Sequence, residues 1–111
     1  MGQKREKWIN QDSDELFRII LGIKDLDEAR RFFRDLLTES EIIEFGQRFK
    51  VARLLYRGVP YREISRRTWM SMRTIARIQK WLQTGKGGYR AVLERAYGHH
   101  PVSSGKRSAV V

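Results

Sequence analysis

The stretch YREISRRTWMSMRTIARI, residues 61–78, decides the fold, because its pattern fits two short helices joined by a tight turn. Apolar residues stand where two steeply crossing helices would touch: Ile64, Met70, Ile75 and Ile78. Ser65 offers the small side chain that the crossing point needs, and Ser71 is a good N-cap for the second helix. The pattern predicts a helix-turn-helix over about residues 60–83, with the turn at 68–71. A generic pair of amphipathic helices is the alternative interpretation.

The turn departs from the usual pattern at one residue. Glycine usually occupies the place of Trp69, because the backbone there is left-handed, which costs a bulky residue about 1–2 kcal/mol. We therefore expect this turn to differ locally from the usual form. Packing between helices is the simplest explanation for the rings of Trp69 and Trp81.

The outer face of the second helix indicates DNA as the partner. With Ile75 and Ile78 turned inward, helical spacing exposes Met72, Arg73, Ala76, Arg77 and Lys80. Arg73 and Arg77 are best suited to read bases, because one guanidinium can bond guanine O6 and N7 together. We expect other polar side chains to hold phosphates without reading sequence: Arg62, Arg66, Arg67, Ser71 and Thr74. The motif predicts a sequence-specific regulator of transcription, most simply a repressor, that binds double-stranded DNA.

The net charge of +10 is concentrated in the half that carries this motif. Residues 1–47 hold 8 Lys/Arg against 11 Asp/Glu, whereas residues 48–95 hold 13 against 2. Such asymmetry is typical of a polyanion-binding region joined to a neutral or acidic one. A basic surface that only keeps the chain soluble is one alternative. An RNA-binding module is another, because basic helices also bind RNA.

The rest of the chain is also predicted to be helical, since no segment alternates like a strand. Further helices are expected over 13–23, 26–37, 38–57 and 89–97. We expect Asp12 or Ser13 to cap the first of these, Asp25 the second and Thr38 the third, which Gly58 should end.

The third helix, 38–57, carries apolar residues on more than one face: Ile42, Ile43, Phe45, Phe49, Val51, Ala52, Leu54 and Leu55. In so short a chain, a partner chain would supply part of their cover, which predicts a homodimer. Tight packing within a monomer is the alternative. We assign residues 1–11 to a flexible arm, 12–97 to the helical DNA-binding and dimerisation domain, and 98–111 to a disordered basic tail.

The composition argues against several other classes of function. The chain has no cysteine and both histidines stand at 99–100, so we predict no metal site, no cofactor and no enzymatic centre. The carboxylates between Asp25 and Glu44 are interpreted as helix caps and solvated faces. No apolar run is long enough to span a bilayer, and the first residues lack a signal peptide's apolar stretch. We therefore predict a cytoplasmic protein without a membrane partner.

Short blocks along the chain resemble the Trp repressor superfamily: Leu36-Leu37-Thr38, Phe45-Gly46-Gln47-Arg48, Leu54-Leu55-Tyr56-Arg57-Gly58, Tyr61-Arg62-Glu63-Ile64 and Thr74-Ile75-Ala76-Arg77. Gly87-Gly88-Tyr89 is more similar to its TrpR-related (YerC/YecD-like) bacterial branch. The resemblance covers about residues 12–95. It implies an all-α fold of six helices and an intertwined homodimer whose helix-turn-helices project as reading heads. A two-fold dimer in turn implies a roughly palindromic operator.

The same resemblance raises the question of a ligand. In the tryptophan-responsive member, two arginines clamp the amino acid; their counterparts are Arg48 and Arg77, with Thr38 beside the pocket. Ile78 stands where that member has glycine, and Trp81 stands where it has serine, so both residues fill space. We therefore expect an internal Trp81 in place of a free ligand and no small-molecule effector. An amino-acid-responsive repressor remains the alternative.

Overall fold

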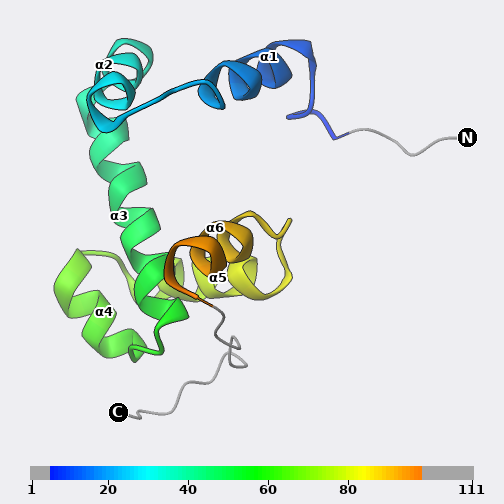
Figure 1. Ribbon diagram of the computed structural model, residues 1–111. Helices are drawn as coiled ribbons and strands as arrows, with labels where there is room; N and C mark the ends of the chain where they lie inside the picture. Colours follow the sequence, from blue (N-terminus) through cyan, green and yellow to red (C-terminus); the bar gives the residue numbers. More distant parts are fainter. Residues whose placement is uncertain (1–5, 99–111) are drawn as a thin grey trace, which may run out of the picture. The chain divides into compact units, whose positions relative to one another are not determined.

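The computed structural model describes residues 6–98, and in that range the chain forms six helices and no strand (Figure 1). The helices are α1 (Gln11–Ile20), α2 (Leu26–Leu36), α3 (Glu39–Tyr56), α4 (Tyr61–Thr68), α5 (Met72–Thr84) and α6 (Gly88–Tyr97). The all-α prediction is therefore confirmed. Residues 1–5 of the predicted arm and residues 99–111 of the predicted tail lie outside the described residues, and both assignments stay predictions.

The chain divides into two compact units, one ending at Glu39 and the other starting at Ser40. In the first unit, Asn10 caps α1: its side chain accepts from the Ser13 amide at 2.9 Å, and the Ser13 hydroxyl accepts from the Asn10 amide at 3.0 Å. The predicted cap at Asp12 or Ser13 is therefore wrong, and α1 begins and ends earlier than expected. Asp25 caps α2 as predicted, accepting from the Glu28 amide at 2.8 Å.

No residue of α1 or α2 is buried. Leu21, directly after α1, is 84% exposed, and Phe17 and Leu26 are exposed as well. Exposed apolar side chains continue along the first half of α3, at Ile43 and Phe45. Within one chain, the residues from α1 through the first half of α3 therefore have no buried core.

The core lies in the second unit, where α3, α4, α5 and α6 contribute to one cluster: Val51, Ala52, Leu54, Leu55, Tyr56, Ile64, Ile75, Ile78, Leu82 and Leu93. α5 is central to this unit, since it packs against both α4 and α6. Only the second half of α3 is buried, which explains why its apolar residues cover more than one face. The two halves of that helix face different surroundings.

The end of α3 is fixed from two sides. Gly58 takes φ 89° and ends the helix as predicted, and the amides of Gly58 and Val59 donate to the carbonyls of Leu55 and Leu54 at 3.0 Å each, which is a Schellman pattern. The Tyr56 hydroxyl donates to the Gly98 carbonyl at 2.5 Å, which ties the end of α6 to the end of α3. This fixed end sets the direction in which the chain enters α4.

Candidate DNA-binding interface

α4 and α5 form the predicted pair of short helices, joined by a turn over residues 69–71. Ile64, Ile75 and Ile78 are fully buried, and Met70 packs against the same core. Ser71 caps α5 as predicted, because its hydroxyl oxygen accepts from the Thr74 amide at 3.1 Å. The local pattern of apolar residues and cap therefore produces the helix-turn-helix geometry.

Trp69 occupies the turn with left-handed backbone angles, φ 66° and ψ 2°. The expectation of a locally different turn is wrong, because the turn keeps its usual form despite the bulky residue. Hydrogen bonds around it explain why: the Thr68 hydroxyl donates to the Ile64 carbonyl at 2.7 Å, and the Ser65 hydroxyl donates to the Met70 carbonyl at 3.0 Å. Packing does not hold the indole, which is 95% exposed, so that expectation is wrong as well.

The outer face of α5 lies open, as helical spacing predicted. Exposed residues on this face are Met72, Arg73, Ala76, Arg77 and Lys80. Among the described residues, Arg73, Arg77 and Lys80 form no ion pair within the chain. Ser71 is exposed and Thr74 is half-buried at the start of the same helix. This face therefore presents three cations without an internal counter-charge.

The cations of α4 are arranged differently. Arg62, Arg66 and Arg67 are exposed, but Arg66 and Arg67 both form ion pairs with Glu63, the latter at 2.8 Å. Hydrogen bonds from Arg67 and Arg66 hold the pKa of Glu63 below its ordinary value. The prediction of phosphate contacts overlooked this carboxylate, although its spacing of three and four residues from the arginines could have indicated it.

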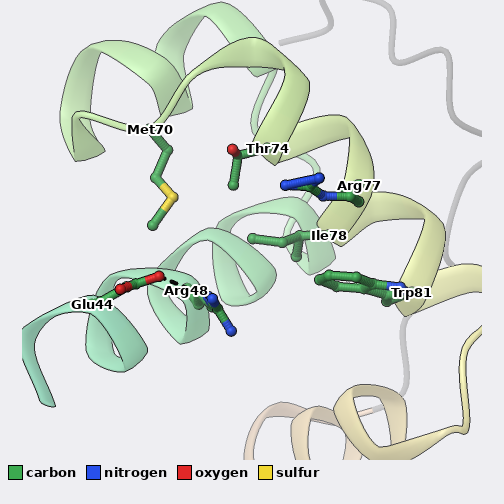
Figure 2. A pocket seen from close by; sticks show the side chains of 7 residues that line it. All are labelled: Glu44, Arg48, Met70, Thr74, Arg77, Ile78 and Trp81. Carbon is green, nitrogen blue, oxygen red and sulfur yellow. Dashed lines mark hydrogen bonds and ion pairs between the residues drawn. The ribbon is translucent and has the colours of Figure 1, made fainter. Parts of the chain in front are cut away.

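A pocket of about 150 Å³ lies between α3 and α5 (Figure 2). Arg48 and Arg77 both line it, each from a different helix, as the resemblance implied. Thr38 belongs to the other unit of the chain, so its place beside the pocket stays a prediction. Ile78 is buried at its wall, whereas Trp81 is 45% exposed, so the prediction of an internal Trp81 is wrong.

Two features make this pocket a poor site for an amino acid. Its volume is below the roughly 300–1,000 Å³ of most ligand pockets. Glu44, which the sequence interpretation did not connect with the pocket, lines it and pairs with Arg48 at 2.9 Å (Figure 2). A ligand carboxylate would compete with Glu44 for that guanidinium.

Within the described residues, no group of His, Cys, Asp and Glu could hold a metal ion. The helices of the same part of the chain include none that is long and apolar enough to cross a membrane. The exposed cations of α5 give its outer face a chemical preference for an anionic partner.

Comparisons with known proteins point the same way. Residues 11–97 match the model of the Trp repressor protein family. YerC of Bacillus subtilis (strain 168) is 40% identical over 101 residues, which cover 91% of this chain and 97% of that protein. A TrpR-like protein from Eubacterium eligens ATCC 27750 has a similar crystal structure, with a TM-score of 0.76, 42% identity, and coverage of 81% of this chain and 93% of that one. A Trp repressor-like protein from Staphylococcus aureus aligns with a TM-score of 0.78 and 33% identity over 90% and 100% of the two chains.

Proposed function

This chain belongs to the Trp repressor family, a family of DNA-binding regulators of transcription, and we propose that it recognises specific duplex sequences through α4 and α5. The observation that carries the proposal is the outer face of α5, where Arg73, Arg77 and Lys80 are exposed without an ion-pair partner among the described residues. A helix of this kind fits the major groove, and its first residues meet base edges.

The residues of the interface divide into two roles. Arg73 and Arg77 would read bases, because a guanidinium can bond two acceptors of guanine at once. Arg62, Arg66 and Arg67 on α4, with Ser71 and Thr74 at the start of α5, would hold phosphates and fix the register. Met72, Ala76 and Lys80 would complete the surface that enters the groove.

The protein would act as a homodimer. α1 and α2 bury no residue within one chain, so their apolar side chains need a second copy for cover. A two-fold dimer would place two recognition helices about 34–36 Å apart on a roughly palindromic operator. Such a dimer, bound over a promoter in the cytoplasm, would repress transcription by excluding the polymerase.

We propose that DNA binding needs no small-molecule effector, given the small pocket and the Glu44–Arg48 pair that lines it. The second candidate is an amino-acid-responsive repressor, and a specific observation favours it: Arg48 and Arg77 do line one pocket. An RNA-binding module is a weaker rival that the exposed Trp69 keeps open, since single-stranded RNA is bound on exposed rings.

Selection of bound sequences from random duplex DNA tests the main proposal, followed by competition with double-stranded RNA and single strands. We expect one enriched, roughly palindromic duplex and weak competition by RNA. Arg73→Ala should weaken binding to the selected site by about 1–3 kcal/mol and relax the sequence preference of the protein. Arg66→Ala should weaken binding to the selected duplex and to random duplexes by the same factor. Equal losses on both kinds of DNA for Arg73→Ala would refute its role as a base reader.

A further inference from the structure

We infer that Trp69 is a DNA-contacting residue whose indole packs on the sugar–phosphate backbone at the edge of the groove that α5 enters. The inference rests on the proposed function and adds to it a contact that carries no charge. The basic residues of α4 and α5 make up the rest of that surface.

The first observation is that the indole takes no part in the packing of the chain. The side chain is 95% exposed, so it fills no space in the core. The turn is held by the hydroxyls of Thr68 and Ser65, neither of which depends on the ring. Glycine adopts the left-handed conformation without the steric cost that a bulky residue incurs. This chain therefore carries a strained, solvent-exposed tryptophan at a position where glycine would strain the backbone less.

The second observation is the position of the indole. Trp69 is the C-cap of α4 and comes three residues before Met72, the first residue of α5, so their Cα atoms are at most about 11 Å apart. Met72 is itself exposed. In helix-turn-helix proteins the start of the second helix meets base edges, and the first helix crosses the backbone. A side chain in the turn between them therefore faces the wall of the groove.

The third consideration is chemical. An indole joins a broad apolar face, which can cover a deoxyribose, to an N–H that can donate to a phosphate oxygen. Sugar and phosphate contacts fix the position of a protein on the duplex without reading its sequence. Because the indole is neutral, its contact releases no counterions. Trp69 would thus contribute affinity that persists when salt weakens the arginines.

The test compares the wild-type protein with Trp69→Gly on the selected duplex and on random duplex DNA. The substitution should have opposite effects on the two properties measured. The melting temperature should stay the same or rise, because glycine relieves the left-handed backbone. Affinity for both duplexes should fall about tenfold. The slope of log affinity against log salt concentration should not change, whereas Arg66→Ala should flatten it.

Two further measurements separate the ring from other causes. Trp69→Phe keeps the apolar face and should retain most of the affinity that Trp69→Gly loses. The difference in fluorescence emission between the wild type and Trp69→Gly gives the contribution of Trp69. Duplex DNA should quench this contribution. If the wild type binds duplex DNA and Trp69→Gly binds it with the same affinity, this inference is overturned and the proposed function stands. Failure of the wild type to bind any duplex would overturn the proposed function and this inference with it.

Discussion

At the scale of single residues, Glu63 controls how much positive charge α4 can offer to a phosphate. It pairs with both Arg66 and Arg67, whose side chains remain about half exposed or more. Exposed ion pairs of this kind are weak, so phosphates can compete for the same guanidinium groups. If α4 holds phosphates as proposed, this carboxylate would compete with DNA for the two guanidinium groups.

We predict that Glu63→Gln tightens binding to all duplex DNA by about two- to fivefold at neutral pH. The pKa of Glu63 lies below its ordinary value, so the carboxylate is ionised at neutral pH and opposes phosphates there. Its ion pairs contribute to stability above the ordinary pKa of Glu, and that contribution is lost as pH falls through the lowered value. The difference between variant and wild type should therefore shrink in acid, and also in high salt.

Glu94→Gln is the matched control for Glu63→Gln, because it removes the same charge from α6. Titration of labelled duplex with each variant measures the effect. An equal gain from both substitutions would show that net charge, rather than competition for Arg66 and Arg67, explains the result.

At the scale of elements, Ser71 connects the stability of α5 to its function. Ser71→Ala removes the oxygen that accepts from the Thr74 amide and should cost about 1 kcal/mol of unfolding free energy. Ser71→Asp keeps an acceptor at the cap, so it should preserve stability, but its charge should repel phosphates and weaken DNA binding. Thermal melts and DNA titrations measure the two properties. An unchanged melt for Ser71→Ala would show that the cap contributes little.

The pocket between α3 and α5 gives a second prediction at this scale. L-tryptophan at millimolar concentration should change neither the DNA affinity nor the melting temperature, because the space is small and Glu44 already pairs with Arg48. Glu44→Gln frees that guanidinium and is the variant in which a carboxylate ligand would be easiest to detect. Calorimetry that finds micromolar tryptophan binding to the wild type, with tighter DNA binding, would favour the amino-acid-responsive alternative.

Local patterns were enough to predict α4, α5 and the cap at Ser71, because the apolar spacing and the cap all lie within one short stretch. The exposure and contacts of individual side chains were harder to predict from the sequence. Trp81 was expected to be internal, although its place near the end of α5 leaves it about half exposed in one chain. Glu44 was interpreted as a solvated carboxylate, and its side chain is about half exposed; its spacing of four residues before Arg48 on the same helix could have indicated the ion pair. The cap at Asn10 was missed because two other capping residues follow it closely.

At the scale of the whole molecule, the exposed apolar residues of α1 and α2 call for a second chain. We predict that sedimentation shows a dimer at micromolar concentration. Phe17→Asp places a charge among these residues and should dissociate the dimer, whereas Gln11→Asp adds the same charge at the start of α1 and should not. A folded monomer of the wild type at that concentration would contradict the prediction.

The division of the chain at Glu39 also has a consequence for how its backbone amides exchange with deuterated water. The unit that starts at Ser40 contains a hydrophobic core. The amides of α5 should therefore be protected from exchange by the stability of the single chain. Amides of α1 and α2 have no such core, and their protection should come from the second copy. Mass action then makes the exchange of α1 and α2 faster on dilution, while α5 keeps its rate. One polypeptide would thus contain two foldons, of which only one depends on concentration.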